Sequence, residues 1–367
     1  MNPFNAFDVS MNNLVAWTEY AKIMSEPVSH DWQWSSPNKY LIDNEAFVLI
    51  RFFPDKPAKG PGILIGAPQA GHSPECIDMD EYRSLVRTLH NLTGRPVYGF
   101  GWKDATYERK DCEFDETVEA IWDSVDAIKK DGCDSVCGAG VCQRGYTFVM
   151  AEALRPGTFA GLLLIASPMD FAAAREKSEI QKALKDRGYG FFERQVVNNG
   201  GLLDGRFILN GFINMNLSKI WHDATTGLYF NILSGDKKAV KRYRGFKRWY
   251  FKTQHLPGKL YLRIVKDLFI DNLLHGKALA VKGEIVDPGK IKCPVAVAYG
   301  DKDEITFPEE ALGILSVISS AKKAAFEVKK AGHFFFASEK HLKTAFIGPI
   351  KFLGLFKEQE QKELLAA

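Results

Sequence analysis

Short apolar runs alternate with helix-length segments along most of the chain, and this alternation constrains the fold more than any other feature. Each run has the length and the apolar or alternating character of a β-strand. The runs lie at residues 46–53, 62–67, 96–102, 134–140, 159–166, 294–300 and 324–330. Helical patterns over residues 79–91, 114–130, 146–154 and 308–318 separate many of them. Strands that alternate with helices predict an α/β fold whose mostly parallel sheet is covered on both faces.

The same pattern divides the chain into segments. Residues 1–45 are predicted to form an N-terminal helical extension, and residues 46–171 the first part of the α/β core. Strand patterns stop between residues 172 and 286, where aromatic, Asn-rich and basic helical stretches predict a cap insertion. Residues 287–367 return to the core. We expect the cap above the carboxyl edge of the sheet, where open α/β folds bind their ligands.

Charge and composition exclude several classes of protein. The chain has 48 Lys and Arg against 45 Asp and Glu, so no overall field favours nucleic acid or an anionic membrane. The first residues do not resemble a signal peptide, and no run approaches the about 20 apolar residues of a membrane helix. A cytoplasmic protein without a transmembrane segment is expected. Six scattered cysteines indicate thiols, and Cys133 and Cys137 lack the second pair that a zinc site needs, so no metal is expected.

The stretch around Cys142 carries the strongest chemical signal. An apolar strand runs into Gly140 and Cys142 and then directly into a helix, which is the context of a nucleophile elbow. Gly140 supplies the small neighbour that the tight turn requires. A helix N-terminus also favours a thiolate. The alternative is a buried, inert cysteine at the end of a strand, because cysteine is among the most buried residue types.

Two further strand ends complete a predicted triad. α/β-Hydrolases present nucleophile, acid and histidine in this chain order, and here Cys142 is followed by Asp303 and His333. Asp301 competes for the role of the acid, but it lies nearer the strand and is expected to cap the turn. Asp303 is our choice, because Ile305 can anchor its loop. The prediction is an α/β-hydrolase fold with a helical cap and a cysteine nucleophile.

An oxyanion hole needs backbone donors from the residue after the nucleophile and from an early loop. Gln143 fits the first position. Gln69 and Ala70 fit the second, in the small-residue loop after the strand at 62–67. His72 in the same loop either orients the substrate or bonds the loop itself, and both roles remain open.

Several motifs together resemble the polyhydroxyalkanoate (PHA/PHB) synthase family, in its short, cysteine-nucleophile type that works with a second subunit. The resemblance covers residues 45 to 350. It is carried by residues 140–143, 167–171, 247–249, 266–269, 286–287 and 291–294, the loop of Asp303, and Gly332 with His333. Residues 66–72 resemble instead a related uncharacterised family that also carries a Cys-Gln-Gly-Gly elbow.

The resemblance implies acyl transfer from a 3-hydroxyacyl-coenzyme A through an acyl group bound to Cys142, with no further cofactor. It also implies a homodimer or a second synthase-type subunit, association with a polymer granule, and Trp249 as a substrate-binding candidate. Arg144 departs from the family, which has Gly there. We expect its side chain either to point into the cleft, where it is a further substrate-binding candidate, or to distort the turn.

Two other functions remain open at this point. The same triad could deliver the acyl group to water, which would make the protein a thioesterase, an esterase or a polyester depolymerase. A non-catalytic relative that binds a granule or a partner is the second alternative, and Arg144 favours it. The basic run at residues 237–252 either attracts coenzyme A phosphates or, as we favour, forms an amphipathic helix with a solvated cationic face.

Overall fold

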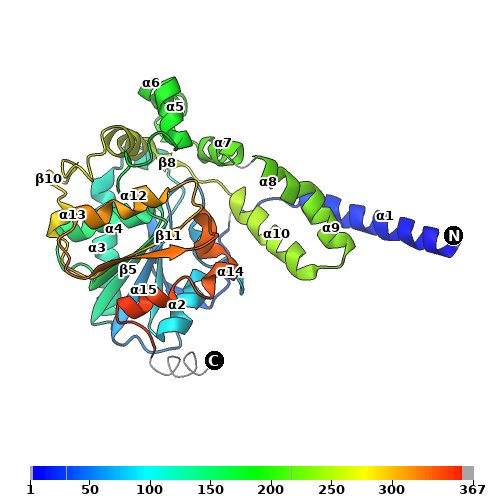
Figure 1. Cartoon of the computed structure of the whole chain (residues 1–367), viewed down its shortest axis with the longest axis horizontal. Helices are drawn as coiled ribbons and strands as arrows, with labels where there is room; N and C mark the ends of the chain where they lie inside the picture. Colours follow the sequence, from blue (N-terminus) through cyan, green and yellow to red (C-terminus); the bar gives the residue numbers. More distant parts are fainter. Residues whose placement is uncertain (1–2, 30, 216, 358–367) are drawn as a thin grey trace.

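A computed structural model describes residues 3–29, 31–215 and 217–357 of the chain. An eight-stranded sheet lies within the main body of the molecule (Figure 1). Its strand order is β1-β2-β4-β3-β5-β6-β11-β12. β1 pairs with β2, and β2 with β4, in antiparallel fashion, while all other neighbours are parallel. The strands are β1 (Asn38–Asp43), β2 (Phe47–Phe52), β3 (Pro61–Gly66), β4 (Val97–Trp102), β5 (Ser135–Val141), β6 (Gly161–Ile165), β11 (Val295–Gly300) and β12 (Lys323–Val328).

Helices cover both faces of this sheet, because the central strands are apolar on both sides. In β3, Leu64 belongs to one buried cluster, together with side chains of α3 (Phe114–Lys130) and α4 (Gln143–Leu154). Its neighbours Ile63 and Ile65 belong to the other cluster, with side chains of α2 (Leu85–Thr93) and α15 (Ile347–Phe352). This three-layer arrangement is the expected α/β-hydrolase fold. None of the described helices has the length and apolar character needed to cross a membrane.

The segment 172–286 is mostly helical, as expected. It contains α5 (Glu179–Arg187), α6 (Tyr189–Asn198), α7 (Gly205–Met215), α8 (Leu217–His222), η3 (Asp223–Gly227), α9 (Leu228–Leu233), α10 (Lys237–Tyr250), α11 (Gly258–Arg263) and η4 (Ile264–Ile270). The sequence did not predict its two short antiparallel pairs, which are β7 (Leu202–Leu203) with β8 (Leu256–Pro257) and β9 (Ala280–Val281) with β10 (Glu284–Ile285).

The N-terminal segment contributes both to the cap and to the sheet. α1 (Pro3–Ser25) packs on α9, and Figure 1 shows α1, α8, α9 and α10 extending to one side of the sheet. β1 begins at Asn38, inside the segment that was expected to be a helical extension, and the sequence did not predict this strand. The reason is that β1 is a half-exposed edge strand of sequence NKYLID, which lacks the apolar pattern of the buried strands.

Two predicted helices have different limits in the structure. α2 begins at Leu85 rather than at residue 79, because Ser84 caps it by accepting a hydrogen bond from the Arg87 N–H. The helix predicted at 308–318 is divided at Gly313 into α12 (Pro308–Leu312) and α13 (Ile314–Val317). A Cβ atom on Gly313 would lie 2.3 Å from Cβ of Asp170, so the chains approach closely there. The remaining short helices are η1 (Pro74–Ile77), η2 (Tyr107–Arg109), η5 (Pro288–Lys290), η6 (His333–Ala337) and α14 (Glu339–Leu342).

Candidate active site

Cys142 lies at a sharp turn between β5 and α4. Its backbone has φ 51° and ψ −124°, a conformation that side chains other than glycine rarely adopt. Two glycines let the turn close: a Cβ on Gly140 would lie 2.7 Å from Cα of Gly145, and a Cβ on Gly145 would lie 2.1 Å from Oγ of Ser167. The strand, the strained residue and the helix together form the predicted nucleophile elbow.

Asp303 and His333 meet beside this turn. The carboxylate oxygens of Asp303 lie 3.0 and 3.1 Å from Nδ1 of His333, and both side chains are buried. Oδ1 of Asp303 also accepts hydrogen bonds from the backbone N–H groups of Ile305 and Thr306. Asp301 instead accepts a hydrogen bond from the N–H of Ala331. The geometry therefore puts Asp303 beside the histidine and Asp301 in the turn, which is the assignment made from the sequence.

The electrostatics of His333 favour a charged imidazolium beside Cys142. Burial opposes a charge on the imidazole, but the negative charges of Asp303 and Cys142, with hydrogen bonds to both groups, raise the pKa of His333 well above its ordinary value. Because Nδ1 faces Asp303, Nε2 is the nitrogen left for Cys142. An imidazolium beside a cysteine favours the thiolate, which is the nucleophilic form.

Two of the three residues predicted for the oxyanion hole come together at a small cavity. Gln143 is the first residue of α4, so its backbone N–H has no acceptor within the helix. Gln69 lies in the loop after β3, and both residues line a cavity of about 10 Å³. Ala70 does not line this cavity, and its carbonyl oxygen lies 3.0 Å from Nδ1 of His72.

His72 and Trp249 both join the loop after β3 to the cap. Nε2 of His72 lies 2.9 Å from the carbonyl oxygen of Tyr250, and the indole N–H of Trp249 donates to the carbonyl of Ser73. Their ring centres are 5.0 Å apart, and burial lowers the pKa of His72. Of the two roles considered for His72, this geometry fits the bonding of its own loop. Trp249 is likewise engaged with protein atoms.

Arg144 does not distort the turn at Cys142, so that sequence-based expectation for it is wrong. Its buried side chain runs across the ends of β3 and β4, where Nε donates to the carbonyl of Ala67 and the guanidinium carbon lies 4.8 Å from the ring centre of Phe100. Gly66 makes this path possible, because a Cβ there would lie 2.0 Å from Cγ of Arg144. No local sequence signal links these two residues, which are far apart along the chain.

A larger apolar cavity of about 340 Å³ opens beside His333. Aromatic side chains from the cap and from η6 dominate its walls. They are Phe212, Tyr243, Phe246, Tyr250, Phe251, Phe334 and Phe335. Sequence reasoning missed this cavity, because its walls come from segments that only the fold brings together. Among the described residues, no three His, Cys, Asp or Glu side chains gather as a metal site would require.

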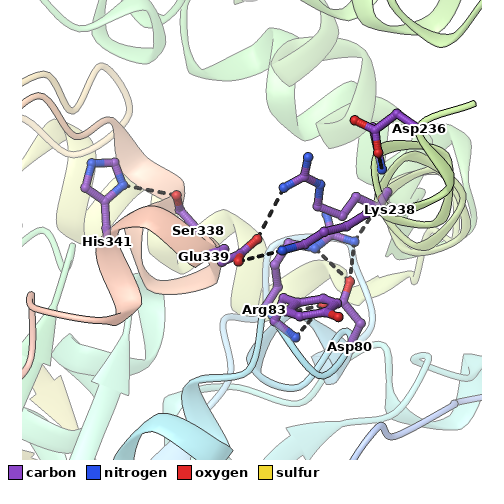
Figure 2. Close-up of polar contacts among 10 residues, drawn as sticks. Asp80, Arg83, Asp236, Lys238, Ser338, Glu339 and His341 are labelled. Carbon is purple, nitrogen blue, oxygen red and sulfur yellow. Dashed lines mark hydrogen bonds and ion pairs between the residues drawn. The ribbon is translucent and has the colours of Figure 1, made fainter. Parts of the chain in front are cut away.

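Ion pairs hold the basic helix α10 over this part of the core. Lys238 and Arg242 both pair with Glu339 of α14, at 2.8 and 3.2 Å. Figure 2 shows Lys238 reaching Glu339, with the Asp80–Arg83 pair beside it. Arg83 also donates to the carbonyl of Arg242. Several cations of the run 237–252 therefore form ion pairs with protein carboxylates, whereas the sequence had favoured a solvated cationic face.

Comparisons with known proteins agree with the fold and with the resemblance. A protein of Rhizobium meliloti described as "Uncharacterized protein in ackA 5'region" is 25% identical over 276 residues, which are 72% of this chain but only 37% of that protein. The poly(3-hydroxyalkanoate) polymerase subunit PhaC of Allochromatium vinosum is 24% identical over 295 residues, covering 78% of this chain and 79% of that protein. The chain is thus a distant, PhaC-like α/β-hydrolase.

A solved structure with a similar fold is the epoxide hydrolase of Bacillus megaterium, with a TM-score of 0.52, 14% identity, and coverage of 86% of this chain and 100% of that chain. At this identity the likeness concerns the fold alone. The family model described as "Protein of unknown function (DUF3141)" matches residues 47–336, which include the elbow, the acid loop and the histidine. The chain therefore belongs to this family of unknown function.

Proposed function

We propose that the protein is an acyltransferase that carries its acyl group on Cys142 and, like the synthases it resembles, takes it from a 3-hydroxyacyl-coenzyme A. The observation that carries the proposal is the buried Asp303–His333 pair beside a cysteine in a strained elbow. Such strain is maintained at sites where it serves a reaction. A cysteine that only filled the core would need neither the strain nor a charged histidine.

In each half-reaction His333 acts first as a general base and then as a general acid. His333 takes the proton of the Cys142 thiol, and the sulfur attacks the thioester carbonyl carbon. The carbonyl oxygen becomes an oxyanion, which the backbone N–H groups of Gln143 and of the loop at Gln69 stabilise. The C–S bond to coenzyme A then breaks, and His333 gives its proton to the leaving thiolate.

The acyl enzyme is resolved by a hydroxyl group. His333 removes the proton of a 3-hydroxyl on a second unit, whose oxygen attacks the Cys142 thioester, and the proton returns to the departing sulfur. The aromatic cavity beside His333 supports this choice, because apolar walls suit an acyl chain and exclude water. If water enters instead, the same triad makes a thioesterase, an esterase or a depolymerase.

The presence of Arg144 beside Cys142 favoured the hypothesis of a non-catalytic relative, because its side chain was expected to disturb the elbow. Its course over β3 and β4 leaves the conformation of Cys142 intact, which removes that reason. A homodimer or a second subunit remains part of the proposal by resemblance.

The test is to mix the protein with 3-hydroxybutyryl-coenzyme A, follow the release of free thiol, and weigh the protein for an acyl adduct. Cys142→Ala should abolish both signals. Cys112→Ala, which removes a partly exposed thiol elsewhere, should change neither. Thiol release with polymer supports the synthase, and release with free acid moves the protein to the hydrolases. Neither release nor adduct, with this thioester and with simple esters, would refute catalysis.

A further inference from the structure

Arg144 is a buried cation for which the described part of the chain supplies no anionic partner. The side chain is 1% exposed. Nε donates to the Ala67 carbonyl at 3.3 Å and Nη1 to the Thr147 hydroxyl at 3.2 Å. Nη2 has no hydrogen-bond partner among the residues that the structure describes. Both of its partners are neutral, and its guanidinium lies over the aromatic ring of Phe100. Burying an unpaired charge is costly, so a protein keeps one where the charge is used.

Arg144 lines the same cavity as Gln143 and Gln69, two of the residues predicted for the oxyanion hole. Arg144, Gln143 and Gln69 together border this space of about 10 Å³, which has room for a single water-sized group. Oε1 of Gln143 is also buried without a partner among the described residues. The cavity is therefore bordered by a cationic residue and by the two residues proposed as backbone donors for a carbonyl oxygen.

The residues around the Arg144 side chain leave space for it and contact its guanidinium. Gly66 ends β3 without a side chain, and a Cβ there would collide with Cγ of Arg144 at 2.0 Å. The ring centre of Phe100 lies 4.8 Å from the guanidinium carbon and that of Trp102 lies 5.8 Å from it, so two aromatic faces support the cation. Burial lowers the pKa of Arg144 only to about 9, which leaves the group charged at neutral pH.

We infer that Arg144 supplies the positive charge of the oxyanion hole, as a positioning residue behind the backbone donors of Gln143 and Gln69. When the Cys142 sulfur bonds to the carbonyl carbon, the electron pair of the C=O bond moves to oxygen and gives that oxygen a full negative charge. The unpaired guanidinium meets this charge in a site that excludes water, where electrostatic stabilisation is strongest. The substrate it favours is therefore one whose reaction passes through an oxyanion, which includes thioesters and esters.

Arg144 also holds the loop after β3 through the Ala67 carbonyl, so the test must separate its charge from this bond. Two reactions of the same sulfur do so. Acylation of Cys142 by p-nitrophenyl acetate forms an oxyanion, whereas alkylation by iodoacetamide displaces iodide and forms none. We expect Arg144→Gln to slow acylation by about 10- to 100-fold, somewhat less than the loss of a direct oxyanion donor, and to leave alkylation close to the wild-type rate. Arg144→Lys, which keeps the charge, should recover most of the acylation rate.

If Arg144→Gln slows acylation and alkylation equally, or slows neither reaction, the inference is overturned. Arg144 then has only a structural role. If Arg144→Lys does not recover the acylation rate, the effect belongs to the hydrogen bonds of the guanidinium with Ala67 and Thr147 rather than to its charge. That result would also overturn the inference. The inference rests on the proposed function. If the wild-type protein is alkylated but never acylated, both fall, whereas normal acylation by Arg144→Gln removes this inference alone.

A measurement on the wild-type protein covers the case in which Arg144→Gln does not fold. An acyl trifluoromethyl ketone adds to the Cys142 thiolate and leaves its oxygen in the oxyanion hole, as a transition-state analogue. Fluorine NMR across pH reports whether that oxygen is charged. If the oxyanion hole carries a positive charge, the adduct oxygen should stay ionised at neutral pH and at pH values well below it. An adduct oxygen that is protonated at neutral pH would contradict the inference.

Discussion

Replacing Asp303 with Asn tests the triad without removing any of its reacting atoms. Oδ1 of Asp303 accepts hydrogen bonds from the N–H groups of Ile305 and Thr306 at 3.0 and 2.9 Å, and an Asn oxygen can accept both. The loop should therefore keep its fold. The Asn amide group would then face Nδ1 of His333 as a donor, which forces the ring proton onto Nε2, where it can no longer receive the thiol proton.

The magnitude follows from the loss of one charge. The carboxylate lies 3.0 Å from Nδ1 of His333, which places the two charge centres about 4 Å apart; at an effective dielectric constant of about 20 their attraction is about 4 kcal/mol. Since about 1.4 kcal/mol corresponds to a factor of ten, acylation of Cys142 should slow by about 10³-fold. The carboxylate also raises the pKa of His333. Without it, the pKa of His333 should fall toward its ordinary value.

The assay is the rate of Cys142 alkylation by iodoacetamide between pH 5 and 10, followed by protein mass. The imidazolium that Asp303 stabilises should favour alkylation of the wild-type protein at neutral pH, and Asp303→Asn should move the alkylation profile to higher pH. Asp301→Asn is the matched control, because Asp301 bonds the Ala331 N–H and should leave the profile unchanged. A wild-type profile for Asp303→Asn, or equal shifts in both variants, would refute the assignment.

Three further substitutions test the surroundings of the site. Gly66→Ala should lower the free energy of unfolding, measured in urea, by about 1–3 kcal/mol through overpacking against Arg144. Adding Arg144→Ala should recover part of this loss. Additive losses in the double variant would contradict the contact between residues 66 and 144. Glu310, whose pKa burial raises to about 8, stabilises the fold less as pH rises from 4.5 to 8. Glu310→Gln should therefore gain stability over wild type across that range, by at most about 5 kcal/mol, and a pH-independent difference would refute this. Lys252→Met should cost about 3–5 kcal/mol because it leaves the buried Glu75 carboxylate unpaired, and adding Glu75→Gln should restore most of it in the same unfolding measurement.

Much of the fold was predictable from the sequence because burial dictates pattern. The central strands must be apolar on both faces, so residues 62–67, 134–140, 159–166 and 294–300 stand out as runs, and the structure has strands at each of them. α3 occupies the predicted residues 114–130. β1 escaped prediction, since an edge strand that is exposed on one side needs no such run.

The candidate triad was predictable for a related reason. In a parallel sheet the carboxyl ends of the strands meet at one edge, so polar residues after successive strands converge there whatever their distance along the chain. Cys142, Asp303 and His333 each follow a strand end, and their order alone indicated the roles. The choice of Asp303 over Asp301 depended on two residues of loop, and only the hydrogen bonds show which carboxylate faces the histidine.

What the sequence by itself determined is therefore the layered sheet, the elbow and the order of the reacting groups, because each depends on local pattern. The tertiary structure alone decided the course of Arg144, the occupation of His72 and Trp249 by backbone carbonyls, and the aromatic cavity beside His333. These features depend on which side chains from distant segments share one space. A Cβ on Gly66 would lie 2.0 Å from Cγ of Arg144 only because the fold brings the end of β3 and the start of α4 together.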